Sequence, residues 1–496
     1  MPGIEPSKDE FLRLARKGNL VPVTCRIMAD LETPVSAFMK LSEGEEHAFL
    51  LESAEHLAGK GRYSFIGLRP TQVITSHGRR MKVVTKGQVN EFDLPEKEDP
   101  LHTLRYVINR YKPAGHESLP PLCGGLVGFL GYEMVGHFEP VPFDKPDEYD
   151  LPDSVFYLAD LIVVFDHQRH ETFIIACAFV EHSADAAYEE ACARIQEVRE
   201  RLARPLPHER FGAGQSQISE PQFNRTKDDY MQAVETAKEH IRAGDIFQVI
   251  VGMRTKVDVQ ANPIDVYRAL RHVNPSPYMF LVRYGHSHMI GASPEILVRL
   301  EGNKVTYRPL AGTRRRGRTP DEDRALEEEM KNDPKECAEH IMLVDLGRND
   351  IGRVCRFRTV QATELMQVER YSHVMHLVST IVGELERGRD GFDLLRATFP
   401  AGTLTGAPKV RAMQIIEKLE PTRRGPYGGA VGYIGFAGDI DFCITLRTIV
   451  MSGQSVYFQA GAGIVADSSP ELEYMECRNK SGAMLRAVEL AECSDE

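Results

Sequence analysis

Two pairs of glutamates have a spacing that could bind a metal ion. Glu336 and Glu339 follow Asp333-Pro334, and Glu473 and Glu476 follow Ser469-Pro470. A spacing of three places both members of a pair on one face of a helix. If the two faces met, they would form an all-oxygen site, which suits Mg²⁺. Alternatively, glutamates in a first helical turn only complement the helix dipole, and this is the more frequent situation for an isolated pair.

Three glycine-rich segments could hold an anion through backbone amides. The first, Gly402–Lys409 (GTLTGAPK), precedes a helix-like run at Val410–Leu419, and a helix start attracts carboxylate or phosphate. It is not a Walker A loop, because three residues rather than four separate its glycines. The second, Gly461–Ala466 (GAGIVA), lacks the third glycine of a dinucleotide fingerprint. The third is the basic segment Ala311–Arg316 (AGTRRR). Each of these segments, taken alone, is also compatible with an ordinary turn.

Two polar residues stand in apolar surroundings. His376 lies in an apolar segment, Ser372–Val378, that is interpreted as helical, and a histidine there is more often a satisfied buried side chain than a catalyst. Arg447 lies in Cys443–Val450 (CITLRTIV), which is interpreted as a strand. A charge among apolar neighbours requires a partner, which could be a bound dianionic ligand or a structural carboxylate.

The elements that must position these residues are predicted to be both helices and strands. Asp333-Pro334 and Ser469-Pro470 each combine an N-cap with proline at the first helical position. Other helices are predicted at Ser183–Ala203 and Lys227–Ala243, whereas the N-terminal third is rich in short apolar strands bounded by turn residues. The pattern is neither strict βαβ alternation nor all-β, so we expect an α+β fold with large antiparallel sheets packed as a sandwich and helices on the outside.

A linker divides the predicted organisation. Residues 204–221 concentrate Pro, Gly, Ser and Gln, so we expect an N-terminal region over residues 1–203 and a second region over residues 222–496.

Composition excludes several classes of protein. The 496 residues carry a formal charge of −12, which disfavours binding to a nucleic-acid backbone. The best apolar run, Phe173–Val180, is far shorter than the roughly 18 residues that a membrane span needs. No hydrophobic segment typical of a secretory signal is visible near the N-terminus, and the nine cysteines form no C-x-x-C pair. We therefore expect a cytoplasmic protein with reduced thiols.

Taken together, the segments resemble the chorismate-utilising enzymes, and within them the large aminating subunits of the anthranilate synthases. The matches occur in the family's order and cover most of residues 222–490. The matching segments are GDIFQ (244–248), GASPE (291–295), PLAGTR (309–314), KECAEHIMLVDLGRNDIGR (335–353), ERYSHVMH (369–376), GTLTGAPK (402–409), the stretch 427–433, GAG (461–463) and RNK (478–480).

The resemblance implies a reaction and roles for individual residues. Chorismate and ammonia would give an aminated intermediate, which would lose pyruvate to give anthranilate. Glu339 and Glu476 would bind Mg²⁺ and through it the ring carboxylate, with Glu336 and Glu473 as neighbouring or alternate ligands. Glu295 would protonate the departing hydroxyl, and His376 would assist proton removal. The remaining substrate contacts implied are Thr403 at the ring, Gly312 and Thr313 in the pocket, and Arg447, Tyr427, Lys480, Gly461, Ala462 and Gly463 around the enolpyruvyl side and second carboxylate.

Two positions distinguish branches of this family. Relatives that form aminodeoxychorismate through a covalent lysine have that lysine where this chain has Ala311, and relatives that add water have a lysine base where it has Gln248. Both residues favour ammonia as the nucleophile. The runner-up is another chorismate enzyme such as aminodeoxychorismate synthase, and a further alternative is a non-catalytic tryptophan sensor that has kept the fold.

The resemblance also implies a partner and an inhibitor. No cysteine lies in the G-x-C-x-G elbow of a glutamine amidotransferase, so a separate glutaminase subunit is expected to supply ammonia within a hetero-oligomer. The segments at residues 50–53 (LLES) and 274–279 (NPSPYM) resemble the tryptophan-regulated members. In that case Glu52, Ser53, Asn274, Pro277, Tyr278 and Met279 would form an effector site for tryptophan, distinct from the chorismate pocket.

Overall fold

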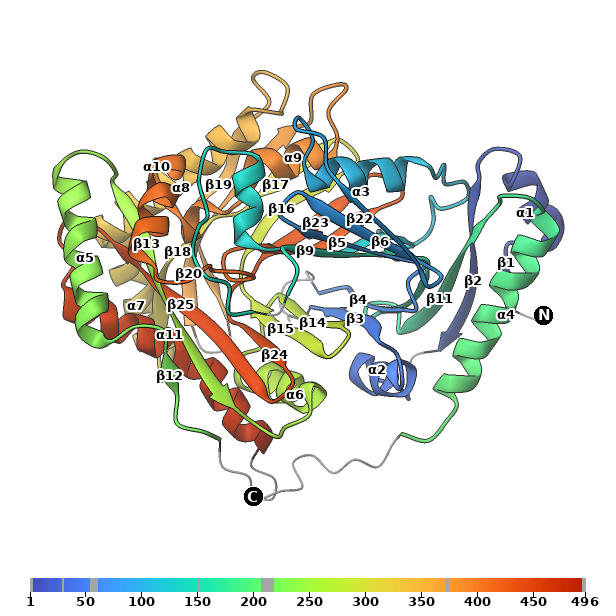
Figure 1. Ribbon diagram of the computed structural model, residues 1–496, viewed down its shortest axis with the longest axis horizontal. Helices are drawn as coiled ribbons and strands as arrows, with labels where there is room; N and C mark the ends of the chain where they lie inside the picture. The colour runs from blue at the N-terminus through green and yellow to red at the C-terminus, as the bar shows by residue number, and fades with distance from the viewer. Residues whose placement is uncertain are drawn as a thin grey trace.

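The computed structural model of the chain describes residues 3–28, 31–53, 61–149, 151–206, 218–371 and 374–492. Two large sheets with antiparallel strand pairing form its centre, and helices cover their outer faces (Figure 1). This confirms the predicted α+β sandwich. No helix in the described part of the chain has the length and apolarity needed to cross a membrane.

The first sheet contains 13 strands within the described residues. In spatial order they are β1 (Ile4–Glu5), β2 (Leu20–Met28), β11 (Glu171–Phe179), β10 (Leu161–Asp166), β4 (Tyr63–Leu68), β3 (His47–Glu52), β14 (Tyr278–Tyr284), β15 (Ser287–Ser293), β24 (Thr448–Ser452), β25 (Ser455–Ile464), β13 (Gln248–Asp258) and β12 (Gln222–Phe223), with β21 (Gly406–Ala407) also paired to β13.

The second sheet contains 12 strands in the same described ranges. Its order is β18 (Leu310–Arg315), β20 (Val374–Glu384), β17 (Lys304–Tyr307), β16 (Ile296–Glu301), β23 (Ile440–Ile444), β22 (Ala430–Gly435), β8 (Gly125–Leu130), β9 (Ser154–Ala159), β5 (Gln72–His77), β6 (Arg80–Thr85) and β7 (Gln88–Asp93), with β19 (Gln361–Arg370) paired to β20.

Both sheets join strands from the two ends of the chain. In the first sheet β3 pairs with β14, with Glu52 opposite Met279, and in the second β8 pairs with β22, with Leu130 opposite Ala430. The two regions predicted on either side of residues 204–221 therefore share both sheets. The division into two domains stays a prediction, because residues 207–217 of the expected linker lie outside the described residues.

Apolar side chains fill the space between the sheets and beneath the helices. One cluster combines Phe49, Phe280 and Val450 of the first sheet with Phe129 and Val431 of the second, and thus forms the interior of the sandwich. Further clusters bury the inner faces of the surrounding helices. These helices are α1 (Lys8–Leu14), α2 (Pro34–Ser42), α3 (Pro100–Asn109), α4 (Ala184–Leu202), α5 (Lys227–Arg242), α6 (Pro263–Val273), α7 (Pro320–Asn332), α8 (Pro334–Gly352), α9 (Gly391–Thr398), α10 (Lys409–Leu419) and α11 (Pro470–Glu492).

The two helices with the clearest sequence signals begin where predicted. Asp333 caps α8 by accepting hydrogen bonds from the backbone N–H groups of Lys335 and Glu336, and Pro334 occupies the first turn. Helix α11 begins at Pro470. Both pairs of glutamates therefore lie within the first two turns of a helix, as predicted.

Two local predictions were wrong. The segment around His376 is not helical: Val374–Glu384 is strand β20, which pairs with β17, β18 and β19. It is buried over most of its length, so its apolar side chains show no alternation that would identify a strand. Arg447 does not lie within a strand but in the turn between β23 and β24, where its φ is +47°.

Candidate active site

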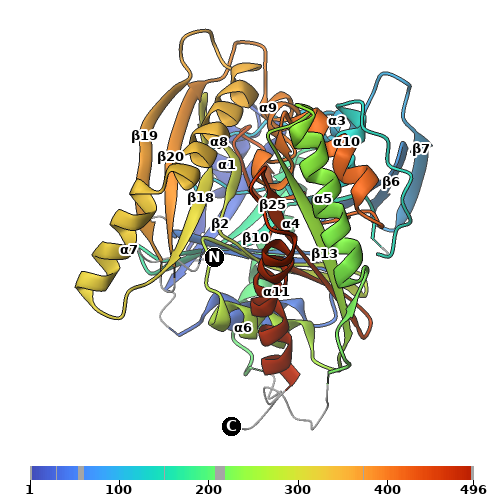
Figure 2. The same cartoon turned by 90° about the vertical axis from the view of Figure 1, so that its left-hand side faces the viewer.

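A cavity of about 790 Å³ lies between two walls formed by residues 248–484. Figure 2 shows α8 with β18 and β20 on one side and α11 with β13 and β25 on the other. The cavity is lined by nearly all predicted catalytic, substrate and metal residues: Glu295, His376, Thr403, Gly312, Thr313, Tyr427, Arg447, Gly461, Gly463, Lys480, Glu339 and Glu476. Ala462 is the exception, because its side chain is buried in the apolar cluster behind β25.

Glu295 is a buried carboxyl group in the wall of this cavity. Its side chain is 5% exposed, and burial raises its pKa to about 8. One oxygen accepts from the backbone N–H of Leu310 at 3.4 Å, and the other accepts from the hydroxyl of Thr403 at 3.3 Å. No described cation pairs with it, so the carboxyl holds a proton at neutral pH and can act as an acid.

His376 is a buried neutral imidazole. Burial lowers its pKa to about 4. Its Nδ1 lies 3.0 Å from the carbonyl oxygen of Gly312 and 3.1 Å from the hydroxyl of Thr313. Since a carbonyl can only accept, Nδ1 carries the proton, and Nε2 retains the lone pair that a base requires.

Arg447 has no carboxylate partner among the described residues. Its Nη1 donates to the carboxamide oxygen of Asn274 at 3.2 Å, and burial lowers its pKa. By contrast, the buried Arg424 is paired with Glu420 at 2.6 Å. A half-buried guanidinium with one neutral acceptor is suited to bind an anionic ligand. The alternative, that a structural carboxylate balances the charge of Arg447, does not hold among the described residues.

Glycine is required at several points of the wall. Gly312 has φ +61°, and a Cβ there would lie 3.0 Å from Glu336 Oε2. A Cβ at Gly461 would meet the hydroxyl of Tyr427 at 2.9 Å, and one at Gly463 would meet Gln248 Nε2 at 2.8 Å. The absence of side chains at these glycines therefore leaves room for three polar groups that line the cavity, those of Glu336, Tyr427 and Gln248.

The four predicted carboxylates all line the cavity, two from each helix. Gln248 Nε2 donates to Glu339 at 2.7 Å, Glu336 pairs with Arg314 at 3.0 Å, and Glu476 pairs with the exposed Lys480 at 2.7 Å. Burial raises the pKa values of Glu339 and Glu473, and the neighbouring carboxylate of each pair adds to the effect.

This donor set is compatible with magnesium. Across the described residues no three His, Cys, Asp or Glu side chains gather as a ready-made metal cluster. Mg²⁺ does not need one, because it keeps several waters and takes only one or two protein carboxylates together with ligand oxygens. Glu339 on α8 and Glu476 on α11, with Glu336 and Glu473 beside them, provide such oxygens at the cavity wall.

The expected anion-binding role of the segment Gly402–Lys409 does not extend to its lysine. Lys409 Nζ lies 2.6 Å from Asp350 and 3.3 Å from the carbonyl oxygen of Thr398. This pair joins the start of α10 to the end of α8, so it has a structural role. Within this segment, the sequence predicts a ligand contact only for the side chain of Thr403. Thr403 lines the cavity.

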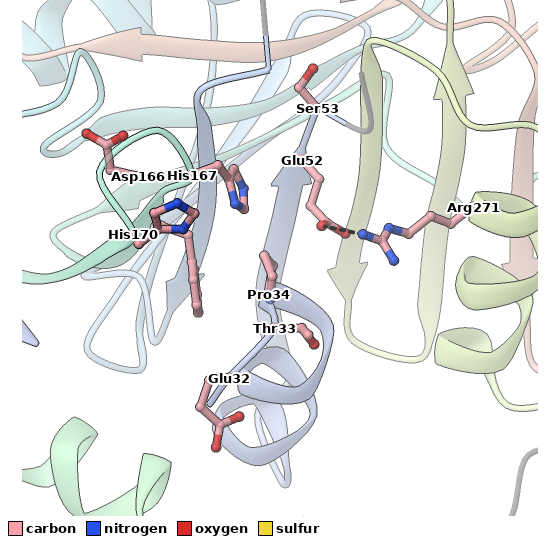
Figure 3. Close-up of a pocket in the computed structure, with 10 residues that line it drawn as sticks. Glu32, Thr33, Pro34, Glu52, Ser53, Asp166, His167, His170 and Arg271 are labelled. Carbon is pink, nitrogen blue, oxygen red and sulfur yellow. Dashed lines mark ion pairs between the residues drawn. The ribbon is translucent and has the colours of Figure 1, made fainter. Parts of the chain in front are cut away.

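Five of the six predicted effector residues lie around a second cavity of about 540 Å³. Glu52, Ser53, Pro277, Tyr278 and Met279 line it, together with residues such as Val431, Tyr433 and Cys443. Asn274 instead lines the first cavity, and Pro277 contributes to both. Glu52 and Ser53 also line a separate pocket, together with Glu32, Asp166 and Arg271. Figure 3 shows this pocket, in which the Glu52 side chain is directed to Arg271. The two charged groups lie 3.7 Å apart. Tyr267 also donates a hydrogen bond to Glu52.

One supporting residue was missed from the sequence. Arg424 is 2% exposed and donates to the carbonyl oxygens of Leu404, at 2.7 Å, and Ile250, at 3.0 Å, both of which line the cavity. Its guanidinium also lies over the ring of Tyr427. The only sequence signal was a pair of arginines directly before the Gly-Pro-Tyr segment, which does not distinguish a buried arginine from an exposed one.

Comparison with known proteins gives consistent results. Residues 46–486 match the family model described as chorismate binding enzyme. Anthranilate synthase component 1 of Cereibacter sphaeroides is 46% identical over 486 residues, which is 97% of each chain. The protein of the same name from Acetivibrio thermocellus is 44% identical and covers 98% of this chain and 99% of its own.

Solved structures support the same grouping. The crystal structure of anthranilate synthase component I from Streptococcus pneumoniae superposes with a TM-score of 0.76 and 36% identity, covering 92% of this chain and 98% of that one. The menaquinone-specific isochorismate synthase of Escherichia coli has a TM-score of 0.71 at 21% identity, covering 97% and 99%, and shows that the fold is shared more widely.

Proposed function

This chain belongs to the family of chorismate binding enzymes and is an enzyme of the anthranilate synthase type, a lyase, and from this premise we propose the chemistry of its cavity. Ammonia adds to the chorismate ring while the ring hydroxyl leaves as water, and the enolpyruvyl group then leaves as pyruvate. The products are anthranilate and pyruvate.

One observation carries this proposal: the same cavity contains a guanidinium that has no carboxylate partner among the described residues, and a protonated carboxyl. Arg447 offers charge to a ligand carboxylate, and Glu295 offers a proton to a leaving hydroxyl. Chorismate has both features, namely two carboxylates and a ring hydroxyl. Thr403 keeps the acid in place through its hydrogen bond to Glu295.

His376 supports the second half of the reaction. Loss of pyruvate from the aminated intermediate requires removal of a ring proton while the C–O bond to the enolpyruvyl group breaks. A neutral imidazole whose Nδ1–H is held by Gly312 presents Nε2 as the acceptor for that proton. Its low pKa ensures that it is unprotonated before the step.

Glu339 and Glu476 are proposed to hold Mg²⁺, with Glu336 and Glu473 beside them. When bound, the ion supplies positive charge that neutralises and orients the ring carboxylate of chorismate. Both carboxylates have partners at the cavity wall, because Gln248 Nε2 donates to Glu339 and Lys480 pairs with Glu476.

The nucleophile is proposed to be ammonia. Neither of the positions that carry lysine in other branches does so here, because Ala311 and Gln248 both line the cavity with uncharged side chains. The source of ammonia is proposed to be glutamine hydrolysed by a separate amidotransferase subunit, as the names of the relatives, component 1, suggest.

The test is turnover by the purified chain. Incubation with chorismate, Mg²⁺ and an ammonium salt should produce anthranilate, detected by its fluorescence and by mass, and an equal amount of pyruvate. Glutamine in place of ammonium should give no product until the amidotransferase subunit is added. Aminodeoxychorismate as the product would contradict the proposed reaction, and glutamine-dependent turnover by this chain alone would contradict the proposed partner.

Feedback inhibition by tryptophan is proposed to act through the second cavity. Pro277, Tyr278 and Met279 offer an apolar wall for an indole, and Ser53 offers a hydroxyl to the amino-acid head. We expect Ser53→Phe, which fills this cavity, to abolish inhibition and to leave turnover within about twofold of the wild type. Unchanged inhibition would place the effector elsewhere.

A further inference from the structure

A buried hydrogen bond joins helix α8 to strand β20, which pack against each other (Figure 2). His340 follows Glu339 on α8 and is fully buried, and its Nε2 lies 2.6 Å from the hydroxyl oxygen of Ser379. Since a hydroxyl both donates and accepts, this bond forms with either tautomer of the imidazole. Neither His340 nor Ser379 belongs to the described lining of the substrate cavity, so the pair acts on the site only through other residues.

The Ser379 hydroxyl is held from a second side. Its oxygen accepts from the backbone N–H of Met366 at 3.0 Å, at a point where β19 departs from regular pairing with β20. Met366 has a φ of +51°, which residues other than glycine rarely adopt. The hydroxyl therefore cannot turn away from His340 without losing another buried hydrogen bond.

The imidazole gives this contact a direction that an apolar side chain would not give. His340 Nδ1 is buried and has no hydrogen-bond partner among the described residues. A buried polar atom without a partner costs free energy, and a leucine at this position would avoid that cost. Apolar contacts, however, allow a helix to slide and rotate on a sheet, whereas a short hydrogen bond in a buried network does not. The pair therefore fixes the rotation and the height of α8 on β20.

The rotation of α8 determines where two of the four cavity carboxylates lie. Glu336 and Glu339 line the cavity from the first two turns of α8, and His340 lies one position after Glu339 and four after Glu336. A carboxylate about 6 Å from the helix axis moves by about 1 Å when the helix turns by about 10°. Mg²⁺ requires oxygen ligands at about 2.0–2.1 Å in near-octahedral geometry, so a shift of this size is enough to lose a ligand.

We propose that His340 is a positioning residue: its bond to Ser379 sets the rotation of α8 on β20 and thereby places Glu336 and Glu339 for Mg²⁺. The inference rests on the proposed function for the metal at these carboxylates. Strand β20 also carries His376, three residues before Ser379. The bond thus connects the helix of the metal carboxylates directly to the strand of the proposed base.

The first experiment measures metal binding by the substrate-free chain. Mn²⁺ is the probe, because it prefers the same oxygen ligands as Mg²⁺ and the free ion is counted by electron paramagnetic resonance. We expect His340→Leu and Ser379→Ala each to raise the Kd for Mn²⁺ at least tenfold, an effect typical of residues that hold metal ligands in place. The double variant should raise it no further than the larger single effect, because both changes remove the same bond. His340→Gln should stay within about threefold of the wild type, because its Nε2 reaches the same hydroxyl.

The matched control is Ser154→Ala, which removes a buried hydroxyl elsewhere. The Ser154 hydroxyl lies 2.7 Å from that of Ser76 between β9 and β5, and both residues lie outside the described cavity lining. We expect this variant to lower the melting temperature about as much as Ser379→Ala and to leave the Kd for Mn²⁺ unchanged. In turnover assays, Ser379→Ala should need at least tenfold more Mg²⁺ for half-maximal rate, while kcat at saturating Mg²⁺ stays within about threefold of the wild type.

The outcomes separate this inference from the proposed function. If Glu339→Gln bound Mn²⁺ as tightly as the wild type, the proposed metal site would be wrong, and the role of His340 would fall with it. If Glu339→Gln lost Mn²⁺ while His340→Leu and Ser379→Ala kept the wild-type Kd, the role of His340 alone would be refuted. An equal rise of Kd in Ser154→Ala would assign the effect to general destabilisation and would refute that role as well. Ser379→Ala provides the reading should His340→Leu fail to fold.

Discussion

The variant Glu295→Gln tests both the proposed role of Glu295 as an acid and the effect of burial on its pKa. The ordinary pKa of a glutamate is 4.5, and that of Glu295 in the folded protein is about 8. Between these pH values the folded chain holds a proton that the unfolded chain has lost, so the free energy of unfolding of the wild type falls as pH rises. At about 1.4 kcal/mol for each pKa unit, the difference between these two pKa values corresponds to a contribution of about 5 kcal/mol to the free energy of unfolding. This contribution is present below pH 4.5 and is lost as pH rises to 8.

Glutamine has the same shape and does not titrate. The free energy of unfolding of Glu295→Gln, measured by urea denaturation, should therefore improve relative to the wild type by about 3 to 5 kcal/mol between pH 4.5 and pH 8.5. The same variant should lose activity by about 10²-fold to 10⁴-fold in kcat, because the leaving hydroxyl no longer receives a proton. In the wild type, kcat should fall about tenfold per pH unit above pH 8, as the acid loses its proton.

The control is Glu190→Gln, the same substitution on the exposed side of α4, which should change neither the pH dependence of stability nor kcat. The reasoning about Glu295 would be refuted by a stability difference between variant and wild type that is independent of pH. An alkaline decline of kcat that persisted in the residual activity of Glu295→Gln would assign that decline to another group.

Three further predictions concern the metal, the base and the supporting arginine. Glu339→Gln and Glu476→Gln should each abolish Mg²⁺-dependent turnover while the melting temperature without metal stays within about 2 °C; near-wild-type activity at limiting Mg²⁺ would exclude either residue as a ligand. His376→Met should still consume chorismate and accumulate an aminated intermediate that retains the pyruvyl group, and mass spectrometry that found only chorismate would assign His376 to binding. Arg424→Gln should lower the free energy of unfolding by about 3 to 5 kcal/mol, because Glu420 is left buried and unpaired, and a loss below 1 kcal/mol in urea titrations would show that water reaches Glu420.

Local signals in the sequence predicted several elements of the site. Helix α8 begins at the predicted position because Asp333 and Pro334 act within one turn, and such capping depends on few residues. The apolar sequence around His376 predicts a helix, because β20 is buried over most of its length and a continuous apolar run does not distinguish a helix from a strand. The turn at Arg447 contains neither glycine nor proline, so nothing local indicated that the strand ends there.

Local sequence patterns do not predict the cavity itself. Glu295, His376 and Arg447 come from segments more than 60 residues apart, and only sheet pairing brings them together. The resemblance to a family assigns these residues to one site, whereas their spacing in the sequence does not. The contact between Asn274 and Arg447 was predicted by neither, since it joins a helix C-cap to a turn 173 residues away.

The pairing of early strands with late ones has a consequence for synthesis on the ribosome. When β3 and β8 emerge, the neighbours that complete their sheets, β14 and β22, have not yet been translated. At roughly 5–20 residues per second, the wait from β8 to β22 is about 15–60 s. During that time strands rich in Phe, Leu and Val have unsatisfied edges that can pair with other nascent chains. The first 200 residues are therefore expected to depend on chaperone binding until the final third of the chain is made.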